Sequence, residues 1–300
     1  MIPRFRLHRP TTLEEAAGLL DAHGQAARAY AGGTELLLVL REGLLEIEHL
    51  VDLKRIPGLS GIRVVEDDGE LEIGALATHT SIAESPLVRE HCPALAAAEG
   101  VLGNRRVRNV GSIGGNLCFG EPHGDVAPVL VALGAALLLR GPEGLRRVLP
   151  EDWLLGPFEV DLRPAEILVA VRVPLRGQVL AYRRIRTLER PTVSVAVALT
   201  ASPGTPGAVS ARVVVGCAGP RPTRVRAAED RLSATSADPQ RVDAADVARR
   251  CGTAAADEVD AVDDLYGPET YKRRLVGVLV RRAVQEAWTG FGGRTMEARA

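Results

Sequence analysis

The chain has 300 residues, of which 46% are hydrophobic and 25% charged, and its formal net charge is −1. This composition is typical of globular domains and excludes wholesale disorder, and the balanced charge argues against a nucleic-acid binder. The four cysteines form no Cys-x-x-Cys pair, so the ligand spacing of zinc sites and iron–sulfur clusters is absent. The longest apolar run, 126–139, is too short to span a bilayer. We therefore expect a cytoplasmic protein with reduced thiols and no integral membrane segment.

The first part of the chain alternates between helix and strand patterns. Thr11 and Thr12 precede Glu14 and Glu15 at capping-box spacing and predict a helix that ends at Gly24. The strands predicted next are 27–31, 49–53, 71–73, 135–140 and 166–173. The helices predicted between them are 34–41, 80–84, 86–100 and 126–133. The glycine- and arginine-rich stretch 102–116 predicts a loop.

The pattern changes near residue 175. Three strands in a row are predicted at 178–186, 193–200 and 209–217, followed by helices at 223–232, 243–256 and 269–288. A change from mixed α/β to strands followed by helices is typical of a domain boundary. We therefore expect a first domain at 1–175, a second at 176–289 and a flexible tail at 290–300.

Two pairs of consecutive glycines stand beside small polar residues. Gly32-Gly33 is followed by Thr34, and Gly114-Gly115 lies between Ser112 and Asn116. Glycines permit positive φ and leave no Cβ to block a ligand, and the N–H groups of such turns form concavities that bind phosphate. Tight turns between elements have the same sequence pattern. The residues alone leave a nucleotide site and plain turns both open.

Other motifs of known chemistry are absent or ambiguous. The chain has no G-x-G-x-x-G motif, no P-loop and no G-x-S-x-G elbow. Glu121, His123 and Asp125 cluster before a predicted helix, as in a metal hydrolase, but Asp125 also suits the N-cap of that helix. Because the sequence places no further ligands near them, we expect no metal site in this chain.

The two glycine segments carry a family resemblance. Residues 29–36 and 107–116 resemble the two flavin-binding segments of the FAD-carrying medium subunit of molybdenum hydroxylases, the xanthine dehydrogenase and carbon monoxide dehydrogenase family. Further segments are similar to that subunit in the same order, at 5–24, 51–59, 73–80, 166–174, 182–186 and 271–275. The resemblance implies an α/β (α+β) fold. Two FAD-binding subdomains of the vanillyl-alcohol oxidase type, divided near residues 55–60, would precede a small α+β C-terminal domain.

The resemblance also assigns cofactor contacts. Residues 29–36 would wrap the FAD pyrophosphate with backbone N–H groups, and 112–116 would complete that cradle. Asp125 would hydrogen-bond the flavin nucleotide, while Tyr182 and Arg183 would lie near the isoalloxazine ring. The implied contacts are Ala29, Tyr30, Ala31, Gly32, Gly33, Thr34, Glu35, Leu36, Leu102, Ser112, Ile113, Gly114, Gly115, Asn116, Asp125, Leu168, Tyr182 and Arg183. No catalytic residue is implied in this chain.

The function implied is electron transfer within a larger enzyme. Electrons would pass from two [2Fe–2S] clusters of a small subunit through FAD to NAD⁺, a quinone, oxygen or another acceptor, after oxidation at the molybdopterin centre of a large subunit. The assembly would be a dimer of heterotrimers. Two alternatives remain: a stand-alone flavoenzyme similar to enolpyruvyl-glucosamine reductase, and a scaffold that has lost its flavin. The metal hydrolase is a third.

Overall fold

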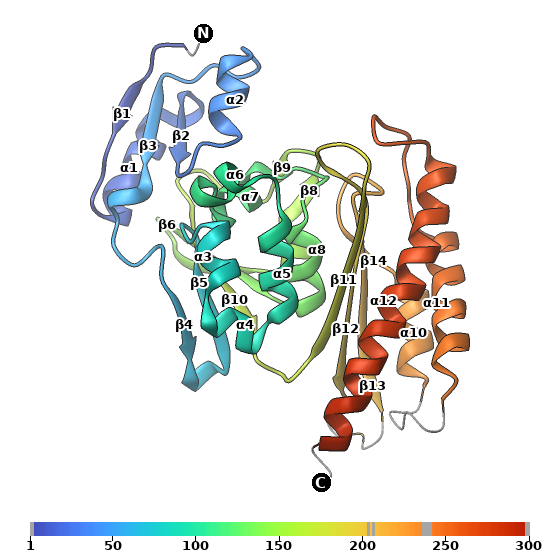
Figure 1. Cartoon of the computed structure of the whole chain (residues 1–300). Helices are drawn as coiled ribbons and strands as arrows, with labels where there is room; N and C mark the ends of the chain where they lie inside the picture. Colours follow the sequence, from blue (N-terminus) through green and yellow to red (C-terminus); the bar gives the residue numbers. More distant parts are fainter. Residues whose placement is uncertain (1–2, 203–204, 206–207, 236–241, 298–300) are drawn as a thin grey trace. The chain divides into compact units, whose positions relative to one another are not determined.

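The computed structural model describes residues 3–202, 205, 208–235 and 242–297 (Figure 1). The chain forms two compact units, one made of Met1–Glu121 and Ala135–Val173, the other of Pro122–Gly134 and Pro174–Ala300. Both units combine helices and sheets, so the predicted mixed α/β class is confirmed. Among the described residues, none of the helices has the length and apolar character that crossing a bilayer requires.

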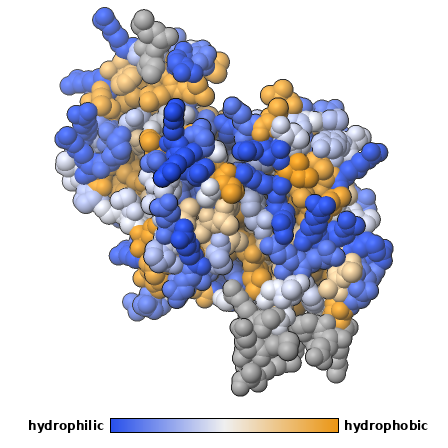
Figure 2. Space-filling view, viewed as in Figure 1, coloured by the Kyte–Doolittle hydropathy of each residue, from blue (hydrophilic) through white to orange (hydrophobic). Residues whose placement is uncertain are grey.

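The N-terminal part of the first unit is a small parallel sheet with strand order β1-β3-β2. Its elements are β1 (Arg6–His8), α1 (Leu13–His23), η1 (Gly24–Ala26), β2 (Ala27–Tyr30), α2 (Leu36–Arg41), β3 (His49–Asp52) and η2 (Leu53–Arg55). Helix α1 begins where predicted, because the Thr12 hydroxyl accepts a hydrogen bond from the Glu15 N–H. Buried Ala16, Leu50 and Val51 bind the helices to the sheet. Apolar residues also reach the visible surface of this region (Figure 2), where Leu44 is exposed.

The rest of the first unit is built on a five-stranded sheet of order β4-β5-β10-β6-β7. Its strands are β4 (Ile62–Val65), β5 (Glu70–Gly74), β6 (Ala136–Gly141), β7 (Gly144–Val148) and β10 (Ile167–Pro174), and β8 (Leu154–Gly156) pairs with β9 (Glu159–Val160) separately. Its helices are η3 (Glu66–Asp68), α3 (His79–Glu84), α4 (Pro86–His91), α5 (Pro93–Val101), α6 (Arg105–Val110), α7 (Ile113–Phe119) and α9 (Pro150–Trp153). The buried Trp153 ring fixes α7 by donating to the Leu117 carbonyl at 2.9 Å.

Two predictions for this region are wrong. The helix predicted at 86–100 is interrupted at Cys92, because Pro93 has no N–H to continue the hydrogen bonding of α4. The loop predicted at 102–116 contains α6 and α7. The Asn104 side chain caps α6 by accepting from the Val107 N–H at 3.1 Å, and Ser112 caps α7 in the same manner. These short-range caps override the glycine and arginine content of the stretch.

Among its described residues, the second unit contains an antiparallel sheet of order β11-β12-β13-β14 and four helices (Figure 1). Its elements are α8 (Val126–Leu133), β11 (Val179–Arg186), β12 (Pro191–Ala201), β13 (Val209–Gly216), β14 (Thr223–Arg224), α10 (Arg226–Ser233), α11 (Ala244–Glu258) and α12 (Glu269–Glu297). Buried side chains of α10, α11 and α12 share one core with the sheet, including Val195, Val213, Cys251 and Val280.

Helix α8 packs within the second unit, although the predicted division at residue 175 puts it in the first domain. All eight of its residues are buried, which is typical of a helix that is apolar on every side. At Gly216 of β13 an added Cβ would lie 2.3 Å from Pro128 of α8, so helix and strand are in close contact. The division at residue 175 stays a prediction, but the segment 122–134 belongs to the second compact unit.

Three further details differ from the prediction. The sheet has a fourth strand, because Thr223 and Arg224 pair with β13 instead of starting a helix. Helix α10 therefore begins at Arg226. Helix α12 continues across Gly290 to Glu297, so the described part of the tail predicted at 290–300 is helical, and its flexibility stays a prediction. Residues 298–300 lie outside the described residues.

Candidate functional site

The first glycine pair lies in the turn between β2 and α2 and needs glycine at both positions. Gly33 has φ of +72°, and a Cβ there would be 2.5 Å from the Tyr30 ring. At Gly32 a Cβ would be 2.0 Å from the Val110 carbonyl oxygen. Each substitution would therefore displace a neighbour, and at Gly33 it would also strain the backbone.

The backbone of this turn offers hydrogen-bond donors that the protein itself does not use. Within the part of the chain that the structure describes, the N–H groups of Gly32, Gly33, Thr34 and Leu36 make no hydrogen bond. The turn is half-buried, so solvent does not fully satisfy these N–H groups. A run of unused N–H groups around a left-handed residue is the arrangement that binds phosphate oxygens. The structure thus fits an anionic cofactor at this turn.

Lys54 lies in η2, directly after the neighbouring strand β3, and contacts the same turn. Its Nζ donates to the Ala31 carbonyl at 3.1 Å, lies 3.3 Å from an Asp52 oxygen, and is 4.1 Å from the centroid of the Tyr30 ring. One lysine therefore fixes both the backbone and the aromatic residue ahead of Gly32. Sequence reasoning missed Lys54, although it is one of only two lysines in an arginine-rich chain.

The second glycine segment differs from the expected cradle. The N–H of Ile113 donates to Ala77, that of Gly114 to Ala75, and those of Gly115 and Asn116 to Ser112. Its backbone N–H groups are therefore occupied, and a ligand there would meet side chains such as that of the half-buried Asn116. The N–H groups of 113–116 thus stabilise the start of α7 in this structure. The expectation that 112–116 supplies half of a backbone N–H cradle stays a prediction.

The two glycines of this segment have different environments. Gly114 is buried, and a Cβ there would lie 2.7 Å from both the Cβ and the carbonyl oxygen of Ala75. Gly115 is exposed, and a Cβ there would meet only the Ser112 hydroxyl, at 3.0 Å. Gly114 is thus required for packing, and Gly115 leaves an open surface at the first turn of α7.

The structure brings the two glycine segments together, as the site hypothesis requires. The close approach of Gly32 to Val110 and Gly111 places the β2–α2 turn against the residues that lead into Ser112. Leu102 is buried near the start of this stretch, where its carbonyl accepts from Arg108 at 3.0 Å. Leu168 is buried in β10 beside a bulge. Its neighbour Val169 accepts from the N–H of Ala75, the residue on which Gly114 packs.

Asp125 does not cap α8, so that prediction is wrong. Its backbone is already helical and its side chain makes no capping hydrogen bond. Instead the carboxylate accepts from the Tyr182 hydroxyl and, at 2.5 Å, from Arg184 Nη1. Burial raises the pKa of Tyr182 well above its ordinary value, and the Asp125 carboxylate raises it further. The phenol is therefore a stable donor to Asp125.

Arg183 and Arg184 lie on opposite faces of β11, as neighbours in a strand must. Arg183 is half exposed and pairs with Glu286 of α12 at 2.6 Å, whereas Arg184 is directed at Asp125. Sequence reasoning chose Arg183 as the functional cation and missed Arg184. Strand alternation from Tyr182 could have found it.

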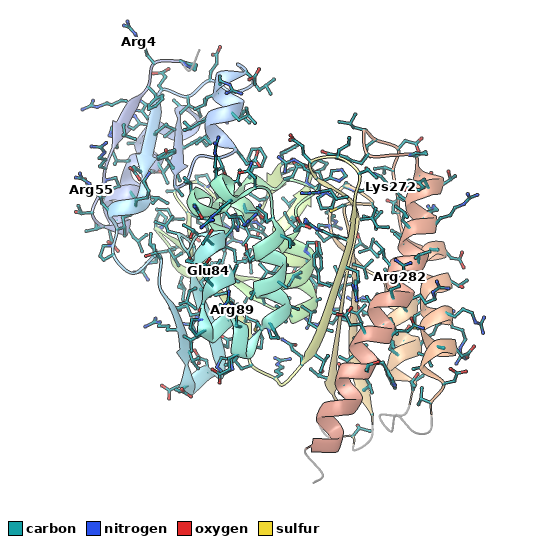
Figure 3. The ribbon with its side chains drawn as sticks, in the orientation of Figure 1. Arg4, Arg55, Glu84, Arg89, Lys272 and Arg282 are labelled. Atoms are coloured by element: carbon teal, nitrogen blue, oxygen red, sulfur yellow. The ribbon has the colours of Figure 1, made fainter. Side chains whose placement is uncertain are left out.

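His123, the centre of the suspected metal cluster, belongs to a buried ion-pair network. Its Nδ1 lies 2.8 Å from the Pro191 carbonyl, its Nε2 lies 3.0 Å from Asp264, and its ring packs on Tyr266. Lys272 in the first turns of α12 (Figure 3) is fully buried, and its Nζ contacts the same Asp264 carboxylate at 2.5 Å. Burial opposes ionisation of Asp264, but the Lys272 and Tyr266 hydrogen bonds outweigh it and lower the pKa. With both ring nitrogens in contacts, His123 gives the hydrolase hypothesis no support.

Comparison with known proteins defines the class of protein that carries this site. Residues 3–176 match the family model described as FAD binding domain in molybdopterin dehydrogenase, and 181–287 match the CO dehydrogenase flavoprotein C-terminal domain. The chain therefore belongs to the family of flavin-binding subunits of molybdopterin dehydrogenases. More particularly, it is an FAD-binding medium subunit of the carbon monoxide dehydrogenase and xanthine dehydrogenase type, a component of molybdenum hydroxylase oxidoreductases.

The similarity extends over nearly the whole chain. The carbon monoxide dehydrogenase medium chain of Hydrogenophaga pseudoflava is 32% identical over 95% of this chain and 98% of its own length. A putative xanthine dehydrogenase FAD-binding subunit of Escherichia coli K12 is 30% identical over 96% of this chain and 97% of its own length. The solved carbon monoxide dehydrogenase from Hydrogenophaga pseudoflava matches with a TM-score of 0.88 and 32% identity, covering 96% of this chain and 99% of that one.

Proposed function

We propose that this chain binds FAD at the Gly32-Gly33 turn and carries electrons from iron–sulfur clusters of a partner subunit to an external acceptor. The observation that carries the proposal is the run of unused N–H groups at Gly32, Gly33, Thr34 and Leu36. FAD, when bound, supplies the ability to exchange electrons singly or in pairs, which protein side chains lack.

The residues of the turn have distinct tasks in this proposal. The backbone N–H groups donate to the pyrophosphate oxygens, and Gly33 gives the turn its left-handed bend. Lys54 holds the turn through the Ala31 carbonyl. Its positive charge also favours a nearby dianionic pyrophosphate. The exposed Gly115 and the half-buried Asn116 would face the cofactor from the second segment.

The remaining assignments stay predictions. Asp125 accepts from Tyr182 and Arg184. We propose that it also hydrogen-bonds the flavin nucleotide, as the resemblance implies. Leu102, Leu168, Tyr182 and Arg183 keep their predicted contacts with the cofactor. The acceptor stays open between NAD⁺, a quinone, oxygen and another carrier.

The kind of protein to which this chain is similar supports a proposal about its partners. One similar solved structure is a Cu,Mo-CO dehydrogenase in its cyanide-inactivated form, and similar proteins include a medium chain and a medium subunit. We propose that this chain joins a small subunit with two [2Fe–2S] clusters and a large molybdopterin subunit, in a cytoplasmic dimer of heterotrimers. The chain itself would perform no chemistry on the organic substrate.

The metal content of the native complex tests this assembly. Mild purification through a tag on this chain from its source cells should give about one molybdenum and about four iron atoms per FAD. A flavoprotein that purifies alone, without iron or molybdenum at any expression level, would contradict the electron-transfer role and favour the stand-alone flavoenzyme.

A further inference from the structure

Three of the six histidines of the chain meet on the N-terminal sheet, away from the glycine turns. They are His8 on β1, His23 at the end of α1 and His49 on β3. One ring nitrogen from each lies within 4.8 Å of the others, and all three residues are half-buried. His8 Nε2 is 2.9 Å from His49 Nδ1. The rings of His23 and His49 are stacked, with their centroids 3.7 Å apart.

The fold itself produces this meeting. In the parallel pair β1-β3, Arg6 lies opposite His49, and His8 stands two residues further along. Residues two apart in a strand point to the same face, so His8 and His49 share a face of the sheet. The last residue of α1 completes the group. Sequence reasoning missed the cluster, because the three histidines are separated by 15 and 26 residues and form no local motif.

The chemistry of the group is that of a metal site. Neutral imidazole nitrogens suit zinc, copper and nickel. Tetrahedral zinc with Zn–N bonds of about 2.0–2.1 Å needs ligand nitrogens about 3.4 Å apart. The His8 and His49 nitrogens, 2.9 Å apart, are somewhat closer than that value, and all three ligand nitrogens lie within 4.8 Å of one another. The stacked His23 ring must turn to point at a shared ion, and this side-chain torsion has a broad energy profile.

We propose that His8, His23 and His49 bind one divalent transition-metal ion of the zinc, copper or nickel type, with water in the fourth position. The ion would tie β1, the end of α1 and β3 together. Strand β3 ends at Asp52, and η2 follows it with Lys54. The ion would therefore stabilise the sheet whose β2 strand leads into the Gly32-Gly33 turn.

The test uses the full-length, untagged flavoprotein after treatment with a chelator. Zinc is titrated in competition with a chromophoric chelator, and Co²⁺ is added separately to read coordination from its visible absorption. The variants are His23→Gln and His49→Gln, and His91→Gln is the matched control, because His91 is a half-buried histidine in α4 outside the cluster. Circular dichroism and flavin content show that each variant is folded.

One zinc ion per chain and a tetrahedral Co²⁺ spectrum are expected for the wild type. Each cluster variant should weaken zinc binding by about tenfold or more, whereas His91→Gln should not change it. Absence of one-to-one binding would overturn the proposal, and so would equal zinc affinity in the two cluster variants and the control. If His49→Gln fails to fold, the zinc affinity of His23→Gln, at the end of α1, tests the proposal alone.

Discussion

Replacing Gly114 and Gly115 separately by alanine distinguishes packing from ligand contact within one glycine pair. At Gly114 the new Cβ would stand 2.7 Å from the Ala75 carbonyl oxygen, to which the Gly114 N–H also donates at 2.8 Å. Overpacking of this kind costs about 1–3 kcal/mol, and disturbing the hydrogen bond costs about 1 kcal/mol more. The better helix propensity of alanine returns up to about 1 kcal/mol. We expect Gly114→Ala to lower the free energy of unfolding by about 1–3 kcal/mol.

Gly115→Ala should behave differently. Its Cβ would meet only the Ser112 hydroxyl at 3.0 Å, and the position is exposed. The gain in helix propensity and the tight contact are of similar size, so the free energy of unfolding should change by less than about 1 kcal/mol. Flavin affinity should fall, because the methyl group stands on the surface proposed to face the cofactor.

Urea denaturation followed by circular dichroism, with and without FAD, measures both effects. The comparison without FAD isolates packing, because no ligand contributes to stability there. If Gly114→Ala were as stable as the wild type without FAD and had lost only flavin binding, the packing role derived for Gly114 would be refuted.

Three further changes probe other contacts. Lys54→Met removes the charged hydrogen bond to the turn and should weaken FAD binding about tenfold in a fluorescence titration of the apoprotein, whereas unchanged affinity would remove Lys54 from the site. Asp264→Ala leaves the buried Lys272 charge without its counter-ion and should cost about 3–5 kcal/mol in urea denaturation; a loss below about 1 kcal/mol would argue against the network. The raised pKa of Tyr182 gives stability that is complete below the ordinary value of 10.0 and is lost as the pH rises above it. Tyr182→Phe should therefore flatten the alkaline part of the stability profile, and an unchanged profile would place the titration elsewhere.

Local signals in the sequence predicted much of the fold. Thr12 and Glu15 define the start of α1. The alternating valines of β12 identify that segment as a strand inside the sheet of the second unit. The sequence predicts a turn that depends on Gly32 and Gly33, and in the structure a Cβ at either position would clash with a neighbour. These features depend on residues close together in the chain, where propensity and capping decide.

The errors concern contacts between residues far apart. Local capping rules predict that the Asp125 side chain caps the N-terminus of α8. In the structure its carboxylate instead accepts hydrogen bonds from Tyr182 and Arg184, which are 57 and 59 residues away. Lys54 reaches Ala31 across the sheet, and such a contact follows from strand order rather than from any local pattern. The occupied N–H groups of 113–116 depend on Ala75 and Ala77, which the sequence did not connect to that segment.

The most direct measurement is an absorption spectrum of the chain expressed alone, followed by heat release and chromatography of any yellow chromophore. We expect the spectrum of an oxidised flavin and release of FAD at about one per chain. We also expect Gly33→Val, strained at φ of +72°, to yield folded protein with little or no FAD. A folded but colourless wild-type protein that takes up no added FAD would contradict the central claim.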